Sequence, residues 1–294
     1  MHHLFLNLLT LYSLLLEDGY LKLSNINMNK WRKYNGALIP ALPPHFNVDA
    51  SNIKQKIKDT SSYFARWSSN FDCDEETDFW YVICDKFLPM ESLSRNTRSK
   101  IRRGLKACSI RLVNKSIIID EGFECYKAAV LNYNTTLNLK TESEFRNDIL
   151  ELEGSWDFWA VFHENRMIGY SQNWLMEDSC DYSTIKLHPD FLSLYSSYVL
   201  FFTMNKYYLD ELKFRYVNDG ARNLLHKTNI QNFLITKFGF RKAYCILHLK
   251  YSTTFKLLVT FIYPFRFVFY AFNNRFATKI NSLFLQEEIR RSFL

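Results

Sequence analysis

Short aromatic and β-branched runs alternate with longer apolar segments of helical period between Trp156 and Tyr251. Apolar residues at every second position predict half-buried strands, and apolar residues every three to four positions predict helices. The predicted strands of this stretch are residues 158–162, 167–175, 180–188, 214–218 and 243–249. The predicted helices are residues 190–209 and 230–238. This order predicts an α/β fold with a mixed central sheet flanked by helices, not a helical bundle or a β-sandwich.

Turn and capping residues separate these elements. The polar residues 163–166 are predicted to form a hairpin turn between the first two strands. Asp190 is placed to cap the first helix, and Gly239 is placed to end the second. Asp219 and Gly220 follow the fourth strand, where they either start a simple turn or expose a functional carboxylate.

The chain before Trp156 is predicted to contain a loop-rich arm over residues 20–50, because Gly36 and several prolines interrupt it. A short helix is predicted from Asp49. Further strands are predicted over residues 79–84 and 109–114, and further helices over 94–108, 121–139 and 141–153. We therefore expect an amino-terminal extension over 1–108, a core over 109–251 and a helical tail over 252–294.

The helix predicted from about Ser94 accounts for most of the net positive charge of the chain. Its apolar face is predicted to contain Ile101, Leu105 and Cys108. Another face contains Arg98, Arg102 and Lys106, which lie about one turn apart. Such a row is either a solvated cationic face or a clamp for a phosphate group, since arginines one turn apart can bind phosphate oxygens in pairs.

Composition narrows the class of protein. Hydrophobic residues make up 48% of the 294 residues, which excludes a disordered chain. The net charge is +7, and residues 95–111 alone contain seven cations and no acid, so a local phosphate or membrane contact is favoured over a surface that is basic throughout. The six cysteines form no CxxC pair, which predicts reduced thiols of a cytoplasmic protein and no metal site.

Both ends of the chain are apolar. The amino terminus lacks the cationic start and small-residue cleavage site of a signal peptide, so a first helix that ends at Gly19 is predicted. The apolar run 255–272 is interrupted by Lys256, Pro264 and Arg266, and is therefore too short and too charged to span a bilayer. The tail is expected to pack on the core, to form a homo-oligomer, or to make a peripheral membrane contact.

The order of elements over about residues 110–250 resembles the GNAT (Gcn5-related N-acyltransferase) fold. Residues 164–169 resemble the entry to the family's third strand, His188-Pro189 resembles the end of its fourth strand, and residues 237–242 resemble the "klGF" phrase after its last core helix. The basic residues 95–108 also resemble the "RxxIRxAxK" helix of FemAB-like proteins. The resemblance implies a single-unit, FemAB-like acyltransferase.

The chain departs from the family at two places. Many GNAT members hold the pyrophosphate of acetyl-CoA with a glycine-rich turn at a helix start, where this chain has Pro189 to Ser197 without glycine. The position at which many members carry a tyrosine general acid falls on Ile235. Hydroxyl donors at the helix entry could replace the missing glycine amides, namely Tyr195, Ser196 and Ser197.

Candidate catalytic residues gather at the end of the fourth strand and on the strands beside it. Asp219 is a candidate base or a partner that orients His226, and His226 is a candidate proton carrier. Tyr182 lies on the neighbouring strand with Gln172 and Asn173 nearby, although buried aromatic and amide side chains are often structural. The remaining candidates for donor binding are Arg222, Lys227 and Asn229.

These observations predict an N-acyltransferase that moves an acyl group from acyl-CoA, foremost acetyl-CoA, or another activated donor to a small amine such as an amino sugar. Two other hypotheses stay open. In one, the donor is aminoacyl-tRNA, held through the cations of residues 95–106. In the other, the chain is a non-catalytic scaffold on the membrane side.

Overall fold

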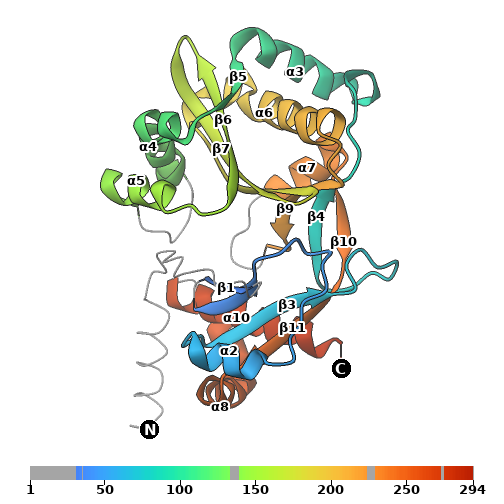
Figure 1. Ribbon diagram of the computed structural model, residues 1–294, viewed down its shortest axis with the longest axis vertical. Helices are drawn as coiled ribbons and strands as arrows, with labels where there is room; N and C mark the ends of the chain where they lie inside the picture. Colours follow the sequence, from blue (N-terminus) through green and yellow to red (C-terminus); the bar gives the residue numbers. More distant parts are fainter. Residues whose placement is uncertain (1–30, 35, 133–138, 224–228, 273–274, 294) are drawn as a thin grey trace. The chain divides into compact units, whose positions relative to one another are not determined.

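The computed structural model describes residues 31–34, 36–132, 139–223, 229–272 and 275–293. These residues form two compact units (Figure 1). Unit 1 contains residues 31–80 and 244–293, and unit 2 contains residues 81–222 and 229–243. The boundaries differ from the expected 108/109 and 251/252, because strand pairing and helix packing join residues 81–108 to unit 2 and residues 246–251 to unit 1.

Unit 2 is built on a seven-stranded mixed sheet with the order β10-β4-β9-β8-β7-β6-β5. Its strands are β4 (Trp80–Cys84), β5 (Ser109–Val113), β6 (Ser155–His163), β7 (Arg166–Met176), β8 (Ser179–Leu187), β9 (Tyr216–Ala221) and β10 (Arg241–Tyr244). Strands β5 to β8 form an antiparallel ladder, β8 and β9 are parallel, and β9 and β4 are antiparallel. The predicted fold class, a mixed central sheet with flanking helices, is confirmed.

Helices cover both faces of this sheet. They are α3 (Arg95–Ala107), α4 (Lys115–Asn132), α5 (Glu142–Leu150), α6 (Ser196–Asn205) and α7 (Ile230–Phe238), with the 3₁₀ turns η1 (Met90–Ser92) and η2 (Pro189–Leu194) and the π-helix η3 (Lys206–Glu211). Along β6, Phe158, Ala160 and Phe162 join a core cluster with α4 and α5, whereas Trp159 between them bonds to η3. The period of two therefore assigns α4 and α5 to one face and α6 with η3 to the other (Figure 1).

Several local predictions for unit 2 are confirmed. The β6–β7 hairpin turns at Glu164 and Asn165, which both have positive φ, as a two-residue turn with a right-handed strand twist requires. The helix predicted over 141–153 is α5, and it begins with a capping box in which Thr141 and Glu144 exchange hydrogen bonds. Gly239 ends α7 in the left-handed conformation, as predicted.

Other local predictions are wrong. Helix α4 begins at Lys115 rather than Glu121. Leu105 is exposed, because the buried line of α3 passes through Ile101 and Gly104 instead. Asp190 does not cap α6, because Pro189 first starts a 3₁₀ turn and α6 begins only after Tyr195, which adopts the left-handed conformation.

Unit 1 has a four-stranded sheet with the order β1-β2-β3-β11. Its strands are β1 (Trp31–Tyr34), β2 (Ala37–Pro40), β3 (Phe64–Ser69) and β11 (Ile246–Tyr251), and its helices are α2 (Ile53–Asp59), α8 (Thr253–Ile262), η4 (Tyr263–Phe265), α9 (Arg266–Tyr270) and α10 (Arg275–Arg291). On β3, Ala65 packs with α2, whereas the adjacent residue Phe64 packs with α8. No helix within the described ranges is long and apolar enough to cross a membrane.

The prediction of a loop-rich arm over residues 20–50 is wrong for residues 31–40, because β1 and β2 form an antiparallel pair there, and it is confirmed for residues 41–50, which form neither helix nor strand. Gly36, with φ of 72°, and Pro40 lie at the two ends of β2 and do not mark continuous loop. The strand predicted over 243–249 is in fact two strands, β10 and β11, in different sheets. They divide at Cys245, whose N–H donates to the carbonyl of Phe79.

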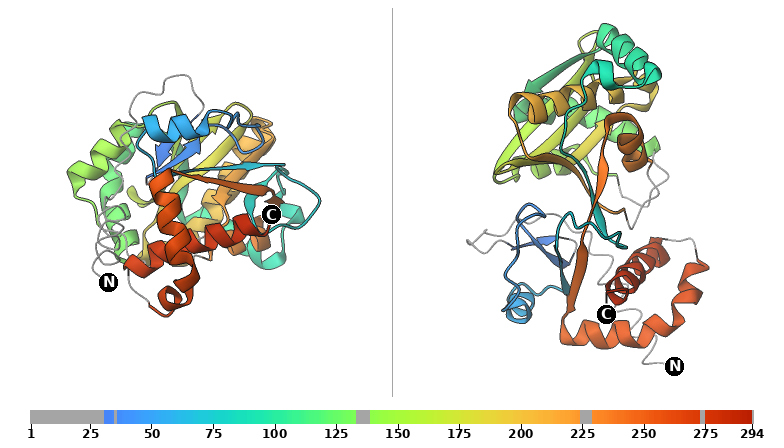
Figure 2. Two further views of the ribbon diagram at one scale, coloured as in Figure 1. Left: turned by 90° about the horizontal axis from the view of Figure 1, so that it is seen from below. Right: turned by 90° about the vertical axis from the view of Figure 1, so that its right-hand side faces the viewer.

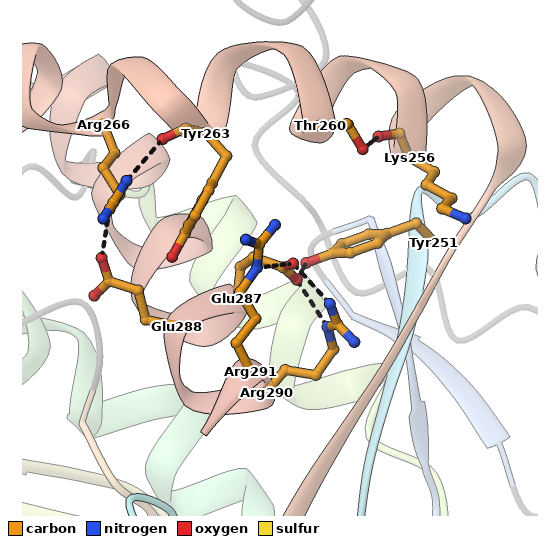
Figure 3. A network of polar contacts seen from close by, with 9 residues as sticks. All are labelled: Tyr251, Lys256, Thr260, Tyr263, Arg266, Glu287, Glu288, Arg290 and Arg291. Carbon is orange, nitrogen blue, oxygen red and sulfur yellow. Dashed lines mark hydrogen bonds and ion pairs between the residues drawn. The ribbon is translucent and has the colours of Figure 1, made fainter. Parts of the chain in front are cut away.

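A buried carboxylate joins α10 to the sheet of unit 1. Glu287 is 3% exposed and accepts hydrogen bonds from Arg290, Arg291 and Tyr251 at 2.8–2.9 Å (Figure 3). Burial would raise the pKa of Glu287, but these hydrogen bonds outweigh it, so the pKa lies below its ordinary value of 4.5. The folded state therefore favours the ionised form.

We expect Glu287→Gln to lower the free energy of unfolding by about 2 kcal/mol at pH 7, because the substitution removes charge-assisted hydrogen bonds in a buried position. A lowered folded-state pKa stabilises the fold fully above the unfolded pKa, so the difference from the parent protein should shrink as the pH falls below about 4.5. Urea unfolding of both proteins between pH 3.5 and 7 measures this difference in the free energy of unfolding. The matched control is Glu288→Gln, since Glu288 is 35% exposed and should matter less; equal losses in both variants would contradict the prediction.

Candidate functional site

The central feature of unit 2 is the place where two parallel strands stop pairing. The β8–β9 ladder ends at Asp181 and Asn218, although β8 continues to Leu187 and β9 continues to Ala221. The outer part of β9 stays paired with β4 on its other side, through Ala221 and Tyr81. Parted carboxyl ends of parallel strands are the place where α/β folds bind ligands, because their backbone groups and side chains become available there.

Asp219 is the first residue of β9 after the last pair with β8. Sequence reasoning ended the strand at Asn218 and placed Asp219 at its edge, whereas the structure includes Asp219 within β9. The pKa of Asp219 is raised to about 7, chiefly by burial; a hydrogen bond with Gln231 of α7 opposes the shift, and the Asp181 carboxylate adds to it. A carboxyl group with a pKa near neutral can accept and release a proton at physiological pH.

Tyr182 is the corresponding first residue of β8 after the last pair. Its side chain is buried, and its hydroxyl donates to Asn205 Oδ1 of α6 at 2.8 Å. Burial raises the pKa of Tyr182 well above its usual range, with smaller contributions from neighbouring groups that include Asp219. Tyr182 and Asp219 therefore interact electrostatically. Tyr182 stays neutral, and its hydroxyl is a hydrogen-bond donor.

A buried polar network that sequence reasoning did not find lies on the same face of the sheet. Its centre is Tyr208 of η3, whose hydroxyl accepts from Trp159 at 2.9 Å and Asn173 at 3.2 Å and donates to Asp157 at 2.9 Å. Burial raises the pKa of Asp157, and the hydrogen bond from Tyr208 partly opposes this. Of the residues named from the sequence, Asn173 belongs to this network. The residues come together only because a π-helix turns Tyr208 inward, and local sequence gives no signal for a π-helix.

The beginning of α6 is covered by α3. A Cβ at Gly104 would lie 2.6 Å from Val199 Cγ1, 3.1 Å from the Leu194 carbonyl oxygen and 3.2 Å from the Tyr195 carbonyl oxygen. Lys100 and Arg103 of α3 lie over the ring of Tyr195, with Arg103 4.8 Å from its centre. The backbone of α3 thus lies where the GNAT resemblance predicts the cradle for a donor pyrophosphate.

The candidate donor-binding residues at this helix start differ in accessibility. Tyr195 is partly buried beneath Arg103, and Ser197 is also partly buried. Ser196 is fully buried, and its hydroxyl oxygen has no hydrogen-bond partner among the described residues. Their donor-binding role stays a prediction.

The three candidate phosphate-binding residues lie on the outer side of α3. Arg102 and Lys106 are exposed, and Arg98 is partly buried and donates to the Glu91 carbonyl at 3.1 Å. Together with Arg95, Ser99 and Arg103 they line a shallow surface depression of about 380 Å³. No ion pair joins these cations to a carboxylate in the part of the chain that the structure describes. The depression is therefore a strongly positive surface.

The other candidates follow β9. Arg222 comes directly after the strand and is partly buried, and Asn229 is exposed immediately before α7. His226 and Lys227 lie outside the described residues, so their predicted roles stay predictions. Among the described residues, no group of three or more His, Cys, Asp or Glu is placed to hold a metal ion.

Comparisons with known proteins concern the fold. No family model and no curated protein matches the sequence at a significant level. Among solved structures, FemX is similar, with a TM-score of 0.56 and 12% identity over 79% of this chain and 85% of that chain. The fold is GNAT-like and of the FemAB type. The resemblance seen in the sequence is thereby confirmed at the level of the fold.

Two further structures show weaker similarity. One is the C-terminal domain of a putative lysylphosphatidylglycerol synthetase from Agrobacterium fabrum, with a TM-score of 0.48 and 11% identity over 78% of this chain and 82% of that domain. The other is a GCN5-related N-acetyltransferase-like protein from Streptococcus suis, with a TM-score of 0.34 and 10% identity over 70% of this chain and 68% of that one.

We expect Asp219→Asn to stabilise the protein at alkaline pH. A carboxyl group whose folded pKa is about 7, against an ordinary 3.8, binds more protons folded than unfolded, so its charge increasingly destabilises the fold as the pH rises between these values. The gain in urea midpoint over the parent protein should be largest above pH 7 and should fade towards pH 4. Asp210→Asn is the control, because Asp210 is half-exposed beside Lys213. A gain that does not vary with pH would contradict the assignment.

Proposed function

We propose that this protein is an N-acyltransferase that carries out amine acylation where β8 and β9 part. The observation that carries the proposal is Asp219, a partly buried carboxyl group with a pKa of about 7 at the end of the pairing between parallel strands. The FemAB-type fold supports the same reaction class. The acceptor is proposed to be a small amine, such as that of an amino sugar.

In the proposed reaction, the amine nitrogen attacks the carbonyl carbon of the activated acyl group. The new C–N bond forms, and the bond from the carbonyl carbon to the leaving sulfur or oxygen breaks. Asp219, as general base, takes the proton that the amine loses, and this proton then passes to the leaving group. Tyr182 is held by Asn205 as a neutral hydroxyl and stabilises the site beside Asp219. Positioning of the two substrates contributes most of the remaining acceleration.

Two phosphate-bearing donors are compatible with the cationic surface of α3. Acyl-CoA, foremost acetyl-CoA, is favoured by the GNAT-like fold and by the parted strands. Aminoacyl-tRNA is favoured by a specific observation: α3 covers the start of α6, while its outer cations line an open depression suited to an extended polyanion. Arg98, Arg102 and Lys106 are proposed to contact the donor phosphates in either case.

We expect Asp219→Asn to lower kcat/KM for amine acylation about 10²- to 10⁴-fold, since removal of a general base has effects of this size. The parent protein should gain activity as the pH rises through about 7, because Asp219 must be ionised to accept the proton. Release of CoA thiol from acyl-CoA, or of uncharged tRNA from aminoacyl-tRNA, in the presence of an amine panel measures both effects. Asp210→Asn should keep full activity. No turnover with either donor class would overturn the proposal and favour a non-catalytic scaffold.

The charge-reversed variant Arg98→Glu/Arg102→Glu distinguishes the donors. If tRNA is the donor, we expect the variant to lose tRNA affinity. The slope of log affinity against log salt should also become less steep, by the amount expected for the loss of about two phosphate contacts. Lys54→Glu/Lys58→Glu on α2 makes the same change of charge among exposed residues of unit 1 and should bind normally. Equal weakening by both double variants would indicate a net-charge effect and contradict a specific phosphate site.

A further inference from the structure

Unit 1 presents a stripe of exposed apolar side chains along α8, η4 and α9. Six large residues have exposed fractions between 56% and 68%: Leu257, Phe261, Phe265, Phe267, Val268 and Phe272. Leu257 and Phe261 lie four positions apart on one side of α8, and the other four follow in η4, in α9 and directly after α9. Elsewhere in the described ranges, exposed large apolar residues are dispersed over separate elements. Soluble proteins seldom expose a contiguous apolar surface of this kind unless it binds something.

The opposite side of the same segment is fixed to the body of unit 1. Phe255, Val259 and Ile262 are buried in a core cluster with α10. The ring of Tyr263 lies between the guanidinium groups of Arg266 and Arg291, at 4.5 and 4.1 Å (Figure 3). The stripe therefore cannot turn inward without breaking this packing, and the fold holds it towards the outside.

Polar contacts restrain the later part of the segment as well. Arg266 Nε donates to Glu288 Oε1 at 3.0 Å, and the Tyr270 hydroxyl lies 3.0 Å from the same oxygen. Asn281 of α10 donates to the Phe269 carbonyl at 3.2 Å. The bend between α8 and α9, seen in Figure 2, is thus held by side chains of α10 and keeps both helices in one arrangement.

Charge identifies the kind of partner. The sequence has no acidic residue from 252 to 286, and it has four cations there, among them Lys256, which is exposed next to Leu257. Arg266 is paired with Glu288, and Glu287 is paired with Arg290 and Arg291, so two copies meeting through the stripe would bring the Lys256 side chains together without an acid of residues 252–294 that is not already ion-paired. A bilayer rich in anionic lipid instead supplies an apolar layer for phenylalanine side chains and negative head groups for the cations.

We propose that the outer side of α8–α9 is a peripheral docking surface for anionic phospholipid bilayers, with the phenylalanine side chains inserted at the interface and Lys256 at the head groups. The proposal is independent of the acyl transfer assigned to unit 2. It also assigns a role to the exposed side of the apolar tail, which neither the core of unit 1 nor the chemistry of Asp219 requires.

Flotation of the full-length protein with vesicles tests the proposal. We expect it to bind vesicles of phosphatidylcholine with phosphatidylglycerol, and to bind pure phosphatidylcholine vesicles at least about fivefold more weakly, since each cation near an anionic surface contributes on the order of 1 kcal/mol. Phe261→Glu/Phe267→Glu should lower the partition coefficient on the order of tenfold or more. Leu131→Glu/Leu150→Glu changes two leucines of unit 2 that are 67% and 51% exposed, and this variant should bind like the parent protein.

Three results would overturn the proposal: a parent protein that does not float with anionic vesicles, equal losses in both double variants, or a stable dimer in solution that only Phe261→Glu/Phe267→Glu dissociates. The last result would show that a second copy covers the stripe. Thermal unfolding and light scattering of each variant in the absence of lipid confirm that the exposed substitutions leave the fold intact and report the oligomeric state.

Discussion

The parallel ladder between β8 and β9 ends after Asp181 and Asn218 while both strands continue, and the candidate chemistry of unit 2 depends on this separation. Were the pairing complete, the backbone groups at Tyr182 and Asp219 would be used within the sheet and would not be available to a ligand. Because β4 holds the other side of β9, the separation does not leave β9 without support. The sheet therefore stays intact while one internal position becomes available for a ligand.

The two tyrosines near this position have different roles. Tyr182 bonds to Asn205 beside the parted strands, whereas Tyr208 bonds to Asp157, Trp159 and Asn173 deeper under the π-helix. Both hydroxyls are satisfied within the protein, as buried polar groups need to be. Tyr182 interacts electrostatically with Asp219, whose own pKa is raised chiefly by burial.

Strong periodic patterns were enough to predict the hairpin 158–175, helix α7 and the order of strands and helices, and the resemblance of short motifs to the family identified this order as GNAT-like. The predictions failed where a short element depended on its partners. Four-residue strands such as β1 and β2 carry too few positions for an apolar pattern, and Gly36 and Pro40 resemble loop punctuation until the pairing is known. Asp219 was expected to follow the fourth strand but lies within β9, and its raised pKa results chiefly from burial in the folded chain, which no local pattern contains. The Tyr208 network could not be predicted for the same reason.

Gly104 allows the close approach of α3 to the start of α6. The helix α3 approaches the start of α6 so closely that any side chain at position 104 would collide with Val199 and with two carbonyl oxygens. A glycine in the middle of a basic helix therefore lets that helix lie directly against the start of another helix, where a residue with a side chain would have to hold the two apart.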